Sequence, residues 1–225
     1  MTEAEPYRSV SRADRPSSGR AVDLRAGDRL LIVVRHGDAG SKENWNGPDR
    51  LRPLASSGRR QAEGLVLRLE DYPVEQILSS PAVRCQQTIQ PLAEDRSLPV
   101  EPVAQLDVDA GPDQLRTILL DRRLHQTVLC THGETISQLF ALLVMEGLMV
   151  QEPLQWPKGS TWLLQHTQVH VRARYLPPLE LDPRHARWRD HPAPVVRGGV
   201  PSRQQYRRRR SNRPIEQADE PRPGL

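Results

Sequence analysis

Two histidines in this sequence share one local pattern, because each comes just after an apolar run and directly before a glycine. His36 follows the run Leu30–Val34 and an arginine, and His132 follows the run Thr127–Cys130 and a threonine. An imidazole can act as a nucleophile, carry a proton or bind an anion, and glycine permits the sharp turn that a strand end needs. The pattern predicts two reactive side chains at the ends of two strands.

Arg35 and Arg84 supply positive charge near these histidines. The strand-like segment Glu75–Ser79 leads into a Ser-Pro pair, which we interpret as an N-cap followed by proline at the first helical position, with Arg84 in the first turn. Helix amino termini attract anions, and the guanidinium fork of arginine matches phosphate oxygens. If the strands are neighbours, both arginines and a protonated His132 form a cationic cradle for a phosphate group. Taken singly, each of these residues would more often be structural.

The segments that must position these residues alternate between strand and helix patterns. Short apolar or β-branched runs predict strands, and apolar residues at helical spacing predict helices. The alternation favours an α/β fold with three layers: a mainly parallel central sheet, flanked by helices, with a late antiparallel hairpin. The expected strands are 30–34, 75–79, 100–103, 127–130, 160–164 and 169–175, and the expected helices are 56–70, 80–93, 112–120 and 134–149.

Charge is distributed unevenly along the 225 residues. Of the 32 basic side chains only Lys42 and Lys158 are lysine, and residues 184–225 carry 11 arginines against four acidic residues. Residues 1–183 are net acidic, so the basic balance of the chain belongs to its tail. We expect a disordered arm over residues 1–27, one domain over residues 28–180 and a disordered Arg/Pro-rich tail over residues 181–225.

Several classes of protein are excluded by composition. The best apolar run, 139–150, is too short and too polar to span a membrane, and the amino terminus lacks the pattern of a secretory signal. Cys85 and Cys130 are too few for a disulfide framework or a four-ligand zinc site, and we interpret both as packing residues. His166 and His170 lack a third ligand. We therefore expect a cytoplasmic protein with no membrane partner, no metal and no cofactor.

The ordered set of motifs resembles the histidine phosphatase superfamily, which includes phosphoglycerate mutases and phosphohistidine phosphatases. The likeness runs from about Leu30 to Tyr175 and is closest to the short SixA-type phosphohistidine phosphatases. The segment Lys158-Gly-Ser-Thr-Trp162 also resembles the phosphatase half of two-domain Nudix–histidine phosphatase proteins, although no Nudix box occurs here. The matching segments are Arg35-His36-Gly37, Arg52-Pro53-Leu54, Gly58-Arg-Arg-Gln-Ala62, Ser79-Ser-Pro81 with Arg84, Gln87 and Thr88, and Thr131-His132-Gly133.

The resemblance implies a phosphoglycerate mutase-like fold and a covalent mechanism. His36 would attack phosphorus and form a phosphohistidine that water then hydrolyses. Arg35, Arg84 and His132 would bind the phosphate oxygens and offset the charge of the transition state. The implied partners are a small phosphorylated substrate or a phosphohistidine protein.

The general acid departs from the family pattern. Relatives usually place an acidic residue after the third strand, and the corresponding position here falls near Val108. Asp109, and as the alternative Asp107, would serve as the acid, although either could equally be a turn residue before the next helix. Phosphohistidine carries a good leaving group and needs no strong acid, so this departure weakens mainly the case for alkyl phosphate esters.

Two other functions compete with a phosphatase. Phosphoglycerate mutases generally carry extra insertions and a glutamate after the Arg-His-Gly motif, where this chain has Asp38. A non-catalytic phosphate- or RNA-binding module would use the basic tail, whose run Arg207–Arg210 has only Tyr206 as a nearby aromatic residue for base stacking. Lys42 could reach a substrate phosphate, and Trp45 with Asn46 could form one wall of the pocket.

Overall fold

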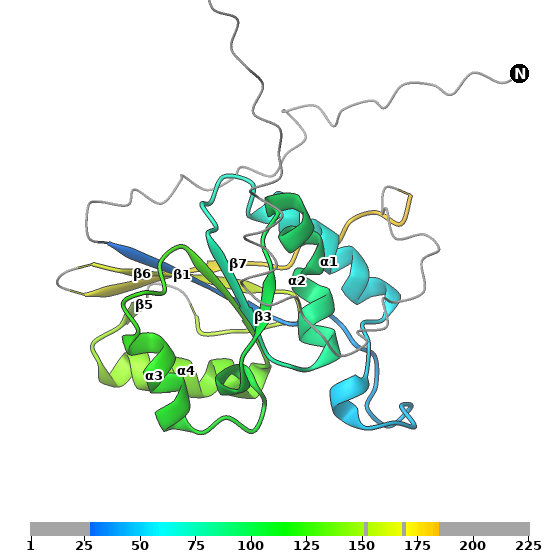
Figure 1. Cartoon of the computed structure of the whole chain (residues 1–225), viewed down its shortest axis with the longest axis horizontal. Helices are drawn as coiled ribbons and strands as arrows, with labels where there is room; N and C mark the ends of the chain where they lie inside the picture. The colour runs from blue at the N-terminus through cyan, green and yellow to red at the C-terminus, as the bar shows by residue number, and fades with distance from the viewer. Residues whose placement is uncertain (1–27, 151–152, 168–169, 185–225) are drawn as a thin grey trace, which may run out of the picture. The chain divides into compact units, whose positions relative to one another are not determined.

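The computed structural model describes residues 28–150, 153–167 and 170–184 (Figure 1). The expected arm over residues 1–27 and most of the expected tail lie outside these residues, and the domain limits stay a prediction. The expected three-layer α/β architecture is confirmed, with a seven-stranded sheet in the order β3-β2-β4-β1-β6-β7-β5. Within the described residues, no helix is long and apolar enough to cross a membrane.

The elements follow the predicted alternation closely. The strands are β1 (Arg29–Arg35), β2 (Gln76–Ser79), β3 (Val100–Pro102), β4 (Thr127–Thr131), β5 (Met149–Val150), β6 (Thr161–His166) and β7 (Val171–Leu176). The α-helices are α1 (Ser56–Arg68), α2 (Val83–Arg96), α3 (Pro112–Leu120) and α4 (Gly133–Met145), and the 3-10 helices are η1 (Asp49–Leu51) and η2 (Ala104–Leu106).

The sheet is parallel over the half that carries the motifs. Strand β1 pairs in parallel with β4, and β4 pairs in parallel with β2, which pairs in parallel with β3. The expected hairpin β6–β7 is antiparallel, and β6 also runs antiparallel to β1. Parallel pairing brings the carboxyl ends of β1, β2 and β4 to one edge of the sheet, as the convergence of the two histidines requires.

The core has one apolar cluster on each face of the sheet, because side chains along a strand alternate between its faces. On β1, Leu30, Ile32 and Val34 pack in the cluster that includes residues of α1 and α2. Leu31 and Val33 pack in the other cluster with residues of α3 and α4. Figure 1 shows the two helix pairs on opposite sides of the sheet. The continuous apolar run 30–34 is thus explained by burial on both faces.

Two helix boundaries differ from the predictions. The predicted N-cap at Ser80 is wrong, because the Ser80 amide still donates to the Cys130 carbonyl of β4 at 2.9 Å, and the helix begins only after Ala82. The helix expected to reach residue 149 ends at Met145, because the chain turns at Gly147 with a φ of 85° and continues into β5. Both differences arise from pairing in the sheet, which local helix propensity cannot predict.

Candidate active site

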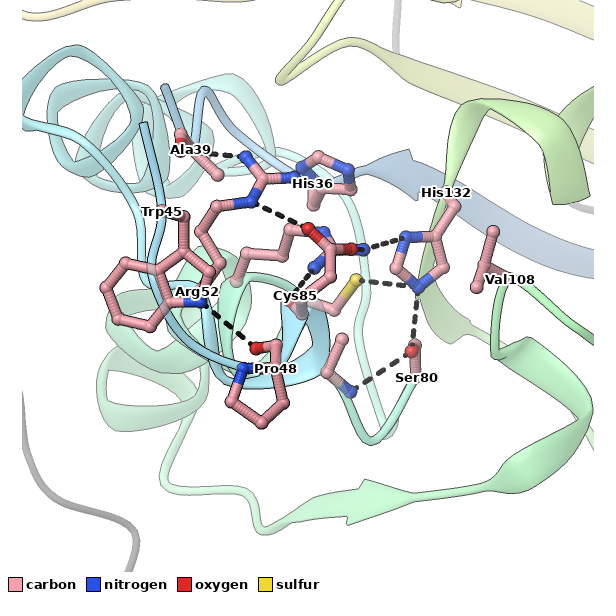
Figure 2. Close-up of polar contacts among 12 residues, drawn as sticks. His36, Ala39, Trp45, Pro48, Arg52, Ser80, Cys85, Val108 and His132 are labelled. Carbon is pink, nitrogen blue, oxygen red and sulfur yellow. Dashed lines mark hydrogen bonds and ion pairs between the residues drawn. The ribbon is translucent and has the colours of Figure 1, made fainter. Parts of the chain in front are cut away.

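The two histidines lie side by side at the carboxyl edge of the sheet. Arg35 is in register with Thr131, so His36 and His132, the next residue on each strand, lie opposite each other. Their ring centroids are 5.3 Å apart with an interplanar angle of 67°. Figure 2 shows both imidazoles at one site. The assumption that the two strands are neighbours is confirmed.

The ring of His36 is held in one tautomer. Its Nδ1 lies 2.8 Å from the Gly37 carbonyl oxygen, and because a carbonyl only accepts, the proton is on Nδ1. Nε2, on the opposite edge of the ring, therefore keeps its lone pair. The backbone is fixed as well, since the His36 amide donates to Thr131 and the Gly37 amide donates to the Thr88 hydroxyl. His36 thus presents a neutral ring with the Nε2 lone pair available.

Burial is the main cause that lowers the pKa of His36 to about 3, with smaller contributions from the positive charges at His132, Arg84 and Arg35. A group with a lowered pKa stays neutral to a lower pH, so we expect the ring to remain unprotonated at pH 5, where free histidine is mostly protonated. Ring ¹⁵N shifts recorded by NMR between pH 4 and 8 test this. A titration midpoint near 6.5 for His36 would contradict it.

Arg84 lies at the start of α2 and is bound by Asp49, a residue that the sequence did not single out. Its NH1 donates to the Asp49 carbonyl at 2.7 Å, and its NH2 lies 3.1 Å from the Asp49 carboxylate. Arg52 donates to the other carboxylate oxygen at 2.8 Å. Partial burial raises the pKa of the Asp49 carboxyl, but the Arg52 hydrogen bond and the Arg84 charge bring it below its ordinary value. The one sequence signal near Asp49 was the Arg52-Pro-Leu motif, which begins three residues after it and directly follows η1.

The guanidinium of Arg35 points toward α4 and the segment 153–160. Its NH1 donates to the Trp156 carbonyl at 2.5 Å. A side chain at Gly133 would meet its Cζ at 2.9 Å, so the glycine after His132 makes room for Arg35. Among the described residues, the buried Arg35 Nε has no hydrogen-bond partner, and such a donor suits an anion in the site.

His132 is almost fully buried and contacts several polar groups. Its Nδ1 lies 3.3 Å from Arg84 NH2, which can only donate, so the neutral ring carries its proton on Nε2. Nε2 lies 2.9 Å from the Ser80 hydroxyl, which donates to Asp107 Oδ1 at 3.2 Å. Ser80 is a site residue by contact, not the helix cap that was expected.

The two candidate acids are placed differently. Asp107 Oδ1 lies 3.6 Å from His132 Nε2, and the same oxygen also accepts from the Val108 amide at 2.9 Å. Asp109 is exposed. Figure 2 shows the side chain of Val108 beside His132. The placement thus favours Asp107 over Asp109, because the loop turns after η2 and sends Asp109 toward solvent.

The remaining candidates are peripheral or structural. Lys42 is exposed, and the Trp45 indole donates to the Pro48 carbonyl at 3.1 Å on the Arg52 side of the site (Figure 2). Cys85 and Cys130 are fully buried, with Cys85 Sγ 3.6 Å from His132 Nε2. His166 contacts Arg29, and His170 accepts from Arg172. Among residues 28–150, 153–167 and 170–184, no group of three His, Cys, Asp or Glu side chains could hold a metal ion.

Comparison with known proteins agrees with the geometry. Residues 31–118 match the family model described as histidine phosphatase superfamily (branch 1). A Mycolicibacterium smegmatis protein named 8-oxo-(d)GTP phosphatase is 34% identical over 171 residues. Residues 31–118 are thus similar to the histidine phosphatase superfamily. That alignment covers 73% of this chain and 53% of the relative, so the chain spans about half the length of this relative.

Solved structures share the fold of this chain. A candidate phosphohistidine phosphatase SixA from Nakamurella multipartitia superposes with a TM-score of 0.54 at 23% identity, covering 68% of this chain and 98% of that chain. A phosphoglycerate mutase from Bacillus anthracis str. Sterne gives 0.53 at 14% identity, covering 66% and 92%. At these identities the likeness establishes the fold alone, and the chemistry is argued from the site.

Proposed function

We propose that this protein is a phosphatase that hydrolyses a phosphomonoester or a phosphohistidine through a covalent intermediate on His36. The observation that carries the proposal is the neutral His36 ring, whose Nδ1 is tied to Gly37 and whose free Nε2 shares the site with His132. Arg35 and Arg84 lie beside it and supply charge for phosphate oxygens. A structural histidine would not need this arrangement.

The proposed reaction has two balanced steps. The Nε2 lone pair attacks phosphorus, the bond from phosphorus to the leaving group breaks, and the leaving group departs with that electron pair. Water then attacks the phosphohistidine, the N–P bond returns its electron pair to Nε2, and inorganic phosphate leaves. Arg35 and Arg84 hold phosphoryl oxygens in both steps, and the Nε2–H of His132 donates to another of these oxygens in place of Ser80. Neither step uses a metal ion, and turnover should therefore persist in the presence of EDTA.

Protonation of the leaving group is the weak part of this site. We propose Asp107, not Asp109, as the acid, because Asp107 contacts His132 and Ser80. The position at which relatives usually carry the acid is Val108 in this chain, and a valine side chain has no proton to give. The site therefore suits substrates whose leaving group departs easily. Phosphohistidine is one, and the phosphoanhydride implied by the relative's name is another.

Asp107→Asn should therefore have a substrate-dependent effect. On an alkyl phosphate such as glycerol phosphate we expect kcat to fall about 10²-fold, because acid catalysis typically contributes 10² to 10⁴. On phosphohistidine the loss should be less than about threefold. Asp109→Asn is the matched control and should leave both rates near wild type. A larger loss in the Asp109 variant would restore Asp109 as the acid.

A substrate panel tests the function as a whole. Initial rates in EDTA are measured with p-nitrophenyl phosphate, a phosphohistidine protein, sugar phosphates and nucleoside triphosphates. Hydrolysis of any of them that is lost in His36→Ala supports the proposal. Transfer of phosphate to a phosphoglycerate without net hydrolysis would favour a mutase, and tail-dependent RNA binding with no hydrolysis would favour a binding module.

A further inference from the structure

The Lys158-Gly-Ser-Thr-Trp162 segment has no role in the reaction described above, yet it touches the catalytic strand along its length. The Gly159 amide lies 3.2 Å from the Arg35 carbonyl and 3.1 Å from the His36 carbonyl, and the Arg35 amide donates to Ser160 at 2.9 Å. Gly159 has a φ of 77°, a backbone conformation that favours glycine. The chain before β6 is therefore bent closely around the Arg-His-Gly motif.

The loop just before this segment holds the guanidinium of Arg35. The Trp156 carbonyl accepts from Arg35 NH1, and within the part of the chain that the structure describes this is the one hydrogen bond that fixes the guanidinium. Trp156 lies in a loop without regular structure, stacked against Phe140 of α4 with ring centroids 6.0 Å apart. The position of the Arg35 guanidinium thus depends on where this loop places one carbonyl oxygen.

An ion pair ties the same loop to the other end of the motif. Lys158 Nζ lies 2.7 Å from Asp38 Oδ1, and the two residues are 120 positions apart in sequence. Asp38 is itself held firmly, since its Oδ2 accepts from the Ser57 hydroxyl at 2.7 Å and its carbonyl accepts from the Ala55 amide at 2.9 Å. The Lys158 hydrogen bond is the main cause that lowers the pKa of Asp38 to about 2.

We propose that the Asp38–Lys158 pair is a latch that positions Arg35 for phosphoryl transfer. Lys158 lies two residues after Trp156, whose carbonyl holds the Arg35 guanidinium. Asp38 lies two residues after His36. The ion pair therefore connects the loop that holds Arg35 to the loop that follows His36. A displacement of about 1 Å at a group that stabilises the transition state can cost 10²-fold in rate. Lys158 and Asp38 are positioning residues, because both act through Arg35.

Lys158→Met should lower kcat about tenfold or more on p-nitrophenyl phosphate, with KM changed less than about threefold, and Lys158→Arg should recover most of the loss. The matched control is Arg60→Met, which removes another pair of the same sequence separation, Arg60–Glu180, away from the site. That variant should keep the wild-type kcat. Equal losses in the Lys158 and Arg60 variants would overturn the latch.

A double-mutant cycle separates positioning from direct contact with substrate. If Lys158 acts through Arg35, then Lys158→Met should add little to the loss already caused by Arg35→Met, and Asp38→Asn should be similarly non-additive with Lys158→Met. Losses that multiply in full would mean that Lys158 binds the substrate itself, and the latch would be wrong. Thermal unfolding of each variant excludes a loss of fold as the cause.

The rate measurements rest on the proposed function, so a second readout is independent of it. NMR relaxation of the Arg35 Nε–H reports how rigidly the guanidinium is held, with or without turnover. We expect this signal to become more mobile in Lys158→Met and to be unchanged in Arg60→Met. An inactive wild-type protein would refute the proposed function, whereas an unchanged Arg35 signal in Lys158→Met would refute the latch.

Discussion

His36→Ala should lose phosphatase turnover by at least about 10³-fold while keeping the fold. The reason is that Nε2 of His36 is the atom proposed to form the bond to phosphorus, and among the described residues no other imidazole in the site is free to replace it. His132 carries its proton on Nε2, against Ser80, and offers its Nδ1 to Arg84. Turnover is measured as release of phosphate from p-nitrophenyl phosphate or phosphohistidine protein, and the fold by circular dichroism and thermal unfolding.

Trapping the intermediate distinguishes loss of the nucleophile from general damage to the site. Wild-type protein quenched during turnover should carry a phosphoryl group that is labile to acid and stable to alkali, as a phosphohistidine is. His132→Ala is the control, because it removes an oxygen-binding partner and should slow labelling without abolishing it. His36→Ala should show no label. Normal turnover in His36→Ala would overturn the assignment.

Gly58→Ala should cause the second large loss, in both stability and activity. A Cβ at Gly58 would lie 2.0 Å from the Asp38 carbonyl oxygen and 2.8 Å from the Asp38 backbone nitrogen. These neighbours are backbone atoms of the loop that follows His36, so α1 and the loop must separate. Alanine ordinarily stabilises a helix relative to glycine by about 1 kcal/mol, and the clash should reverse that sign and destabilise the protein by about 2–4 kcal/mol.

The activity of Gly58→Ala should fall about 10²-fold even in the folded fraction, because the same separation displaces His36 and the Asp38 end of the loop. Urea unfolding gives the stability, and kcat corrected for the folded fraction gives the positioning effect. Gly111→Ala is the matched control, since Gly111 has a φ of −77° and, among the described residues, no heavy atom lies within 4 Å of where its Cβ would be. It should cost less than about 1 kcal/mol. Equal behaviour of the two variants would contradict the close-approach explanation.

The parts of the fold that sequence predicted well are those fixed by local burial and local turns. The run 30–34 had to lie in a strand covered on both faces, because no alternation of polar residues offered a solvent-facing side. Pro112 marked the start of α3 correctly, since proline at the first helical position leaves no amide unpaired. His36 and His132 could be placed at strand ends for the same local reason.

Sequence reasoning failed where a distant segment competes for a hydrogen-bonding group. Ser80 looked like a helix cap, but its amide is used by β4 and its hydroxyl by His132, and both partners are about 50 residues away. Asp107 and Asp109 differ by two positions, and only the turn after η2 decides which one faces His132. Asp49 had no pattern of its own that linked it to Arg84.

By itself, therefore, the sequence determined the candidate reactive groups and the ends of the strands that carry them. The tertiary structure alone decided that β4 lies between β1 and β2, which brings His36, His132 and Arg84 together. It also decided that a loop 120 residues away fastens Asp38 and supports Arg35. The physical reason is that burial and turn preferences act on neighbouring residues, whereas strand order and long-range hydrogen bonds depend on which distant segments satisfy each other's polar groups.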